Sequence, residues 1–140
     1  MKIILLIIAV LNISENFNSP EALFKASKEN NKPVLIFFSG SDWCHNCMKM
    51  DEKVVKTSLF SEKIESRTVF YQADFPQKNK QEKTTIKMNE ELADAYNSSG
   101  IFPLLVLIDG DKSVLQKTTF VSSDPSFYVD LFSKDIDANN

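Results

Sequence analysis

Hydrophobic and polar residues follow one another in blocks that predict alternating helices and strands. Apolar side chains at spacings of three and four predict amphipathic helices, and short continuous or alternating apolar runs predict strands. The predicted helices span residues 19–28, 43–58, 89–97 and 123–136. The predicted strands span residues 33–38, 68–75, 102–109 and 113–120.

Local signals mark several boundaries of these elements. Ser-Pro-Glu at 19–21 supplies a side-chain cap, a proline and an acid for the first turn of a helix, and the polar residues 28–32 end it. Gly-Asp at 110–111 predicts a two-residue turn between the last two strands. The polar residues 76–87 are predicted to form the least ordered internal loop, and residues 137–140 a frayed tail.

The order of the elements predicts an α/β fold. After a short first strand at residues 10–13, the elements follow as α, β, α, β, α, β, β, α. Alternating helices and strands followed by a hairpin predict a central mixed sheet of four to five strands with helices on both faces. A chain of 140 residues is long enough for one well-packed domain, which we expect over residues 15–140.

Composition and charge narrow the classes of function. Hydrophobic residues make up 43% of the chain and charged residues 25%, which is ordinary for a globular protein and excludes a wholly disordered chain. The formal net charge is -3, and lysines are interspersed with acids. A nucleic-acid partner would need a concentrated basic face, so none is expected.

The first residues form an apolar block of their own. Lys2 is followed by an unbroken apolar run over residues 3–11, which is too short for a membrane-spanning helix of about 20 residues but fits the apolar region of a secretory signal. No small-x-small cleavage pattern follows it, and residues 10–13 could instead form a buried first strand. We favour an export signal over residues 1–14 and hence a periplasmic or secreted protein with no stable membrane span; a cytoplasmic protein is the alternative.

The candidate chemistry is concentrated in residues 39–50, which contain both cysteines, the only tryptophan and the only histidine. Cys44 falls where a buried strand gives way to a helix, and the free N–H groups and the dipole of a helix N-terminus stabilise a thiolate. Cys47, one helical turn later, is close enough to attack a mixed disulfide. The spacing therefore predicts that Cys44 attacks a substrate disulfide and that Cys47 resolves the intermediate.

Three other uses of the cysteine pair fit less well. A structural disulfide across so small a loop stabilises little, because the gain grows with the logarithm of loop length. A structural zinc site needs four ligands, whereas the chain has two cysteines and one histidine, so no metal site is expected. Haem attachment would need the histidine just after the second cysteine, and His45 instead follows Cys44.

Two neighbours of Cys44 are candidates for supporting roles. Trp43 directly precedes it and is expected to form part of a flat apolar docking surface rather than core packing. A cationic His45 would stabilise the Cys44 thiolate and make the pair more oxidising, whereas a solvent-facing His45 would have little effect. The sequence favours neither of these two roles for His45.

Two motifs give the chain a resemblance to a known family. FFSGSDWCHNCMKMDEKV, residues 37–54, joins an apolar strand to an amphipathic helix and resembles the redox motif of the thioredoxin superfamily, most closely that of its exported bacterial branch. AYNSSGIFPLLVLIDGDKSVL, residues 95–115, resembles the thioredoxin segment that carries a cis-proline and the following hairpin. The resemblance spans about residues 17–136 and implies a thioredoxin-like three-layer sandwich.

The resemblance also implies roles for particular residues. Cys44 would be the attacking thiol, Cys47 the resolving thiol, and Pro103 a cis-proline that faces the pair. The cis bond would leave the backbone of Phe102 free to pair with an extended substrate, beside the docking surface of Trp43. The alternative for Pro103 is an ordinary proline of an edge strand.

These roles imply a thiol–disulfide oxidoreductase, a disulfide reductase or isomerase that acts on protein substrates with cysteines or disulfides. Its redox group would be the Cys44–Cys47 disulfide, with no added cofactor, and an upstream thiol–disulfide protein would donate or accept electrons. A monomer is expected. The alternative from another class is a thioredoxin-like binding module or chaperone whose cysteine pair is not catalytic.

Three departures from the family pattern bear on the mechanism. Thioredoxins commonly carry a buried acid in the strand before the motif, which assists proton transfer at the resolving cysteine, and here Phe37 or Phe38 stands in its place. His45 and Asn46 replace Gly-Pro between the cysteines. The loop at residues 76–87 is longer than in compact thioredoxins and is a candidate for shaping partner choice.

Overall fold

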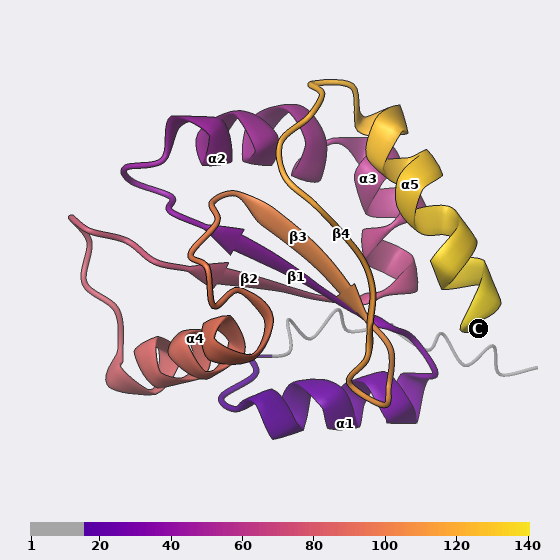
Figure 1. Cartoon of the computed structure of the whole chain (residues 1–140), viewed down its shortest axis with the longest axis horizontal. Coiled ribbons are helices and arrows are strands. Elements are labelled where there is room, and N and C mark those ends of the chain that lie inside the picture. Colours follow the sequence, from indigo (N-terminus) through magenta and orange to yellow (C-terminus); the bar gives the residue numbers. More distant parts are fainter. Residues whose placement is uncertain (1–15) are drawn as a thin grey trace, which may run out of the picture.

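Four strands form a mixed sheet at the centre of the fold, in the order β2-β1-β3-β4 (Figure 1). The structure, a computed structural model, describes residues 16–140. The strands are β1 (Val34–Ser39), β2 (Val69–Asp74), β3 (Leu104–Ile108) and β4 (Val114–Thr118). β1 runs parallel to β2 and antiparallel to β3, and β4 pairs antiparallel with β3. The mixed sheet predicted from the sequence is confirmed, with four strands within the described residues.

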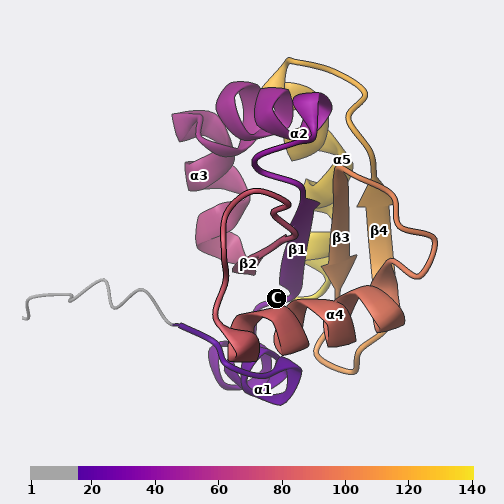
Figure 2. The same ribbon diagram turned by 90° about the vertical axis from the view of Figure 1, so that its left-hand side faces the viewer.

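Helices cover both faces of the sheet, which confirms the predicted three layers (Figure 2). α1 (Pro20–Asn30) and α4 (Lys83–Tyr96) lie on one face, whereas α2 (His45–Met50), α3 (Ser58–Lys63) and α5 (Pro125–Ala138) lie on the other. Two apolar clusters, one on each side of the sheet, fill the space between the layers.

β1 supplies side chains to both clusters, because successive residues of a strand point to opposite faces. Ile36 and Phe38 pack with α1 and α4, and Leu35 and Phe37 pack with the helices of the other face. Every residue of β1 and β3 is buried, which accounts for their continuous apolar runs in the sequence. This buried pair of strands is the base from which the cysteine-containing segment emerges.

The first and last helices begin within two residues of their predicted starts. The Ser19 hydroxyl accepts the N–H of Ala22 at 3.2 Å at the start of α1. The Asp124 carboxylate accepts the N–H of Ser126 at 2.9 Å at the start of α5. α5 then continues to Ala138, so the frayed tail predicted over residues 137–140 is wrong for its first two residues.

The helix predicted over residues 43–58 is shorter and less uniform than expected. α2 begins at His45 and passes at Asp51 into a π-helical turn, η1 (Asp51–Val55). Both kinds of turn place apolar side chains such as Val54 toward the sheet. Amphipathic spacing therefore could not distinguish them.

Apart from Ser58, α3 and a short 3-10 helix, η2 (Glu65–Arg67), lie in a stretch for which no element was predicted. The Thr57 side chain caps α3 by accepting the N–H of Phe60 at 3.3 Å. Phe60 and Ile64 lie four residues apart and are fully buried. The helical spacing is thus present in the sequence, but it extends over too few residues to stand out.

The turn of the β3–β4 hairpin is longer than the predicted Gly-Asp pair at 110–111. The Asp109 carboxylate accepts the N–H groups of Asp111 and Ser113, each at 2.9 Å. Lys112 adopts the left-handed conformation, with φ 69°. The side chain of Asp109 therefore stabilises a wider turn than the glycine alone would predict.

The segment predicted as a loop over residues 76–87 is partly helical, because α4 begins at Lys83. The first turn of α4 is largely exposed and polar, so its composition resembles that of a loop. The Asp42 carboxylate holds the part before the helix, accepting the backbone N–H groups of residues 77–79 at 2.8 to 2.9 Å. This loop is therefore anchored to the turn that leads to Cys44.

The three hydrogen bonds lower the pKa of Asp42, with the N–H of Gln77 contributing most and desolvation opposing the shift. Because the pKa of Asp42 is lowered in the folded state, its carboxylate is ionised and the hydrogen bonds are intact above the ordinary Asp pKa of about 3.9. The stabilisation from these hydrogen bonds is lost as the pH falls through the lower folded-state pKa, because a protonated carboxyl is a poorer acceptor.

The apolar segment of residues 1–14, with its alternative strand at 10–13, lies outside the described residues. The export signal therefore stays a prediction. In residues 16–140, no helix has both the length and the apolar content needed to cross a membrane.

Replacing Asp42 with alanine is predicted to release the loop at residues 77–79. Their amide hydrogens should exchange with solvent about fivefold to tenfold faster, which corresponds to the loss of one ordinary hydrogen bond. Amide hydrogen exchange measured by NMR checks this. In the wild-type protein, the amide chemical shifts of the same residues should move as the pH falls through the lowered pKa of Asp42.

Asp94→Ala, at an exposed position on α4, is the matched control and should leave these amides unchanged. Equal exchange rates in wild type and Asp42→Ala would contradict the anchoring role.

Candidate active site

Cys44 lies at the N-terminus of α2, at the end of a tight turn that follows β1. The carbonyl of Gly40 accepts the N–H groups of Trp43 at 3.3 Å and Cys44 at 2.9 Å, which closes the turn. Cys44 is the N-cap residue of α2, and its Sγ accepts the N–H of Cys47 at 3.2 Å. A thiolate at this atom would keep that N–H and gain the favourable potential of the helix N-terminus.

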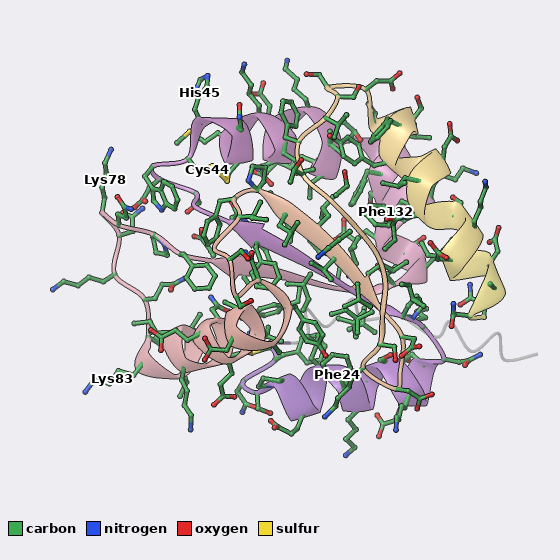
Figure 3. The ribbon with its side chains drawn as sticks, viewed as in Figure 1. Phe24, Cys44, His45, Lys78, Lys83 and Phe132 are labelled. Carbon is green, nitrogen blue, oxygen red and sulfur yellow. A yellow bond between two sulfur atoms is a disulfide. The ribbon has the colours of Figure 1, made fainter. Side chains whose placement is uncertain are left out.

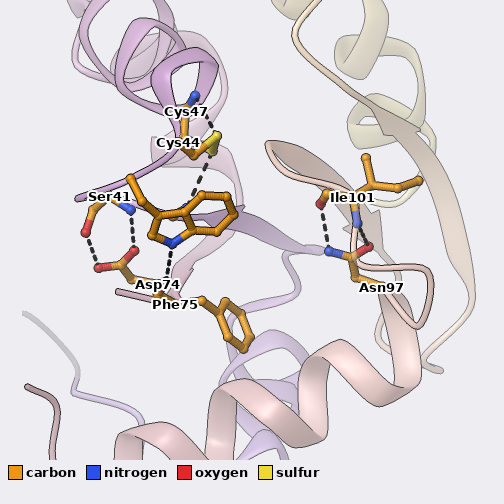
Figure 4. Close-up of a disulfide and its surroundings, with 9 residues drawn as sticks. Ser41, Cys44, Cys47, Asp74, Phe75, Asn97 and Ile101 are labelled. Carbon is orange, nitrogen blue, oxygen red and sulfur yellow. Dashed lines mark hydrogen bonds between the residues drawn. A yellow bond between two sulfur atoms is a disulfide. The ribbon is translucent and has the colours of Figure 1, made fainter. Parts of the chain in front are cut away.

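Cys44 and Cys47 form a disulfide, with their Cα atoms 5.2 Å apart (Figure 4). The two residues differ in access, because Cys44 is 8% exposed and Cys47 is fully buried. The N–H of Gly40 donates to the Cys47 Sγ at 3.4 Å. One cysteine can therefore be reached by a partner while the other faces the interior.

Trp43 covers the turn beside Cys44 and is 38% exposed. Its Nε1–H donates to the carbonyl of Phe75 at 2.7 Å, and its ring packs edge-to-face on Phe102, with the ring centroids 5.6 Å apart. A Cβ at Gly40 would lie 2.3 Å from a carbon of the indole, so glycine is needed to leave room for this ring. The indole is thus fixed in place with part of its surface open to contact.

Phe102 and Pro103 directly precede β3, and the ring of Phe102 lies against Trp43 of this turn. The peptide bond between them is cis, as the family resemblance implies. Pro103 is buried and Phe102 is half-buried. Phe102 also packs edge-to-face on Phe75, with 5.4 Å between the ring centroids. The rings of Trp43, Phe75 and Phe102 therefore form one aromatic cluster beside Cys44.

Asn97 fixes the loop before Pro103, a role that was not predicted from the sequence. Its Nδ2 donates to the carbonyl of Ile101 at 2.8 Å, and its Oδ1 accepts the N–H of Ile101 at 2.9 Å (Figure 4). Gly100, inside this loop, has φ 66°, which favours glycine. The Asn-Ser-Ser-Gly sequence at 97–100 is a turn signal that could have indicated the role.

A second carboxylate holds the end of β2 against the cysteine-containing turn. The Asp74 carboxylate accepts two hydrogen bonds from Ser41, one from its N–H at 2.9 Å and one from its hydroxyl at 2.5 Å (Figure 4). Together with the Asp42 anchor, it ties the turn to the segment that follows β2. Neither acid was singled out from the sequence, and neither was Phe75, because each contact joins residues that are far apart along the chain.

His45 projects from the first turn of α2 into solvent (Figure 3). From this position it can influence Cys44 only through its charge. Within residues 16–140, no group of three or more His, Cys, Asp and Glu side chains is arranged to hold a metal ion.

Comparison with known sequences identifies relatives of the chain. Residues 20–137 match the model of a thioredoxin-like domain. The chain is 37% identical over 103 residues to the disulfide bond reductase DsbH of Chlamydia pneumoniae, across 74% of this chain and 61% of that protein. It is 28% identical over 92 residues to the thioredoxin-related protein DsbJ of the same organism, across 66% of this chain and 26% of DsbJ. The match therefore spans less than two thirds of the length of each relative.

Solved structures share the same arrangement of helices and strands. The DsbH oxidoreductase superposes with a TM-score of 0.78 at 31% identity, covering 87% of this chain and 84% of that one. The C-terminal domain of Neisseria meningitidis DsbD in its oxidised form gives a TM-score of 0.58 at 21% identity, covering 86% of this chain and 91% of that one. The domain match over most of the chain and the shared three-layer fold lead to one conclusion: the chain belongs to the thioredoxin-like domain family.

Proposed function

We propose that this chain is a thiol–disulfide oxidoreductase that reduces disulfides in protein substrates. The observation that carries the proposal is the unequal access of its cysteines, because Cys44 keeps 8% of its surface exposed and Cys47 is fully buried. An attacking thiol must be reachable, whereas a resolving thiol should meet only the mixed disulfide at its neighbour. The similarity to a relative named a disulfide bond reductase supports the same activity.

The proposed reaction has two steps, both made by the reduced cysteine pair. The Cys44 thiolate attacks one sulfur of the substrate disulfide, a bond forms between Cys44 and that sulfur, and the other substrate sulfur leaves as a thiolate. Cys47 then attacks the Cys44 sulfur and releases the second substrate thiolate. This leaves the Cys44–Cys47 disulfide of the present structure. Two electrons pass from the cysteine pair to the substrate, so the pair itself is the redox group.

Trp43, Phe102 and Pro103 are the residues that we assign to substrate binding. The partly exposed indole and the ring of Phe102 offer a flat apolar contact next to Cys44. The backbone of Phe102 is assigned to form main-chain hydrogen bonds with the extended substrate segment that carries the reacting cysteine. Main-chain pairing suits substrates of varied sequence, because it does not depend on their side chains.

The proposed cycle also needs an electron donor, because each turnover leaves the cysteine pair oxidised. We assign this role to an upstream thiol–disulfide protein. The apolar run over residues 3–11 supports a place for the cycle in an exported compartment. Isomerisation would use the same mixed disulfide at Cys44 but would release it by a substrate thiol, and the name of the relative favours reduction.

The wild-type protein is predicted to accelerate the reduction of insulin by dithiothreitol, measured as the turbidity of precipitating insulin chains. Cys44→Ser should abolish the acceleration because it removes the attacking thiol. Cys47→Ala keeps that thiol and, once reduced and mixed with insulin in the absence of dithiothreitol, should accumulate a mixed disulfide with an insulin chain through Cys44, detected by mass spectrometry. A binding module with an idle cysteine pair would accelerate nothing in either the wild type or Cys44→Ser, and that outcome would contradict the proposed activity.

His45→Ala is predicted to make the cysteine pair more reducing. A cationic imidazole beside Cys44 favours the thiolate and hence the reduced form, and an exposed charge pair is typically worth up to about 1 kcal/mol, or about fivefold in the equilibrium constant with glutathione. Lys134→Ala, which removes an exposed cation of α5, is the control and should change nothing. Equal equilibrium constants for wild type and His45→Ala would show that the histidine does not tune the pair.

A further inference from the structure

β1 lacks the acid on which a resolving cysteine commonly relies for proton transfer. Phe37 and Phe38 occupy the relevant positions and are fully buried, one in each apolar cluster. In the proposed reaction, Cys47 must lose its thiol proton to attack Cys44, because the thiolate is the nucleophile. Cys47 is itself fully buried, so this proton needs a route to an acceptor near the interior.

A cavity of about 270 Å³ lies next to Cys47. Its lining includes Ser39 at the end of β1, Ser41 in the turn that follows, Asp51 at the start of η1 and Lys56 at its C-cap. The cavity has room for several water molecules, and its hydroxyl and carboxylate groups can hydrogen-bond to them. Cys47 and Asp51 thus both line one polar cavity.

The π-helical turn η1 places an ion pair at this cavity. The N–H of Lys56 donates to the carbonyl of Asp51 at 2.9 Å, and the Lys56 Nζ lies 2.8 Å from Asp51 Oδ2. Neighbouring side chains of an α-helix lie three and four residues apart. The wider π turn instead brings together side chains five residues apart, and π turns within helices are frequent at functional sites.

Lys56 offsets the charge of Asp51. The side chain of Asp51 is 25% exposed and that of Lys56 is 71% exposed, so the ammonium reaches the carboxylate from the solvent side. The hydrogen bond to Asp51 and its charge raise the pKa of Lys56, which therefore remains a cation. An unpaired carboxylate would repel a forming Cys47 thiolate, and the cation reduces that repulsion.

The other polar groups at the cavity are less suited to receive the proton. Glu52 also lines it, but its side chain is 75% exposed and lies 3.7 Å from Lys53. Gln72, contributed by β2, is neutral. Asp74 bonds to Ser41 but does not itself line the cavity. Asp51 is thus the acid of the cavity lining whose carboxylate is partly buried.

We propose that Asp51, held by Lys56, accepts the proton of Cys47 through water in this cavity during the resolving step; this inference rests on the proposed oxidoreductase activity. The Cys47 S–H bond breaks, the proton passes to the carboxylate, and the Cys47 sulfur forms a bond with the Cys44 sulfur. The bond between Cys44 and the substrate sulfur breaks. The substrate leaves with that electron pair as a thiolate and takes a proton from solvent.

Dithiobis-nitrobenzoate and the reduced full chain allow the two steps to be followed separately. Attack by Cys44 releases one thionitrobenzoate and forms a mixed disulfide, and attack by Cys47 releases the second. Asp51→Asn is predicted to slow the second release at neutral pH by at least about tenfold, because a positioned general base is lost. The first release should keep its wild-type rate.

The pH dependence distinguishes proton transfer from a structural role. In Asp51→Asn, the second release should accelerate about tenfold per pH unit up to the ordinary pKa of a thiol, about 8.5, because hydroxide must replace the carboxylate. The wild-type rate should rise less steeply. Glu52→Gln changes the other acid of the cavity and is the matched control, which should keep the wild-type profile.

Two outcomes would overturn the role of Asp51, and a third would contradict the proposed activity itself. A second release in Asp51→Asn that is as fast as in wild type, or faster, would overturn the inference and leave the proposed activity intact. Equal slowing of both releases would indicate a structural role for Asp51 and would also overturn it. A wild-type protein that shows no first release would instead contradict the proposed oxidoreductase.

Discussion

The antiparallel pairing of β1 with β3 is the constraint on which the candidate site depends. Phe38 lies opposite Leu104, so the end of β1 and the start of β3 meet at the same edge of the sheet. The chain leaves β1 toward Cys44 and enters β3 through Pro103, which brings together two segments that are distant in sequence. Both strands are buried along their whole length. A slip of one residue would turn every side chain to the opposite face, so the register is strongly fixed.

Polar contacts then shape the loops that the sheet brings together. Burial of apolar surface is not directional, whereas hydrogen bonds fix the direction and distance of particular groups. Asp42 and Asp74 tie the cysteine-containing turn to the segment after β2, and Asn97 braces the loop before β3. The position of Trp43 depends on both kinds of interaction, since its ring packs on Phe102 and its N–H is bonded to a backbone carbonyl.

Features that depend on neighbouring residues could be predicted from the sequence, and features that depend on distant contacts could not. The buried strand at 33–38, the capped helix starts and the position of Cys44 at a strand-to-helix turn follow from local pattern. The role of Asp42 does not, because its partners lie about 35 residues further along the chain and adopt no regular structure. The Asp51–Lys56 pair depends on a π turn, whose wider spacing no amphipathic pattern reveals.

The reduction potential of the Cys44–Cys47 couple shows most directly whether the pair is catalytic. Equilibration with defined glutathione mixtures, followed by alkylation of free thiols and mass spectrometry, gives the fraction of reduced protein. A catalytic pair should show one reversible transition between about -270 and -120 mV, the range of thiol–disulfide catalysts. A disulfide that stays oxidised at potentials below about -300 mV, as structural disulfides do, would contradict a catalytic role.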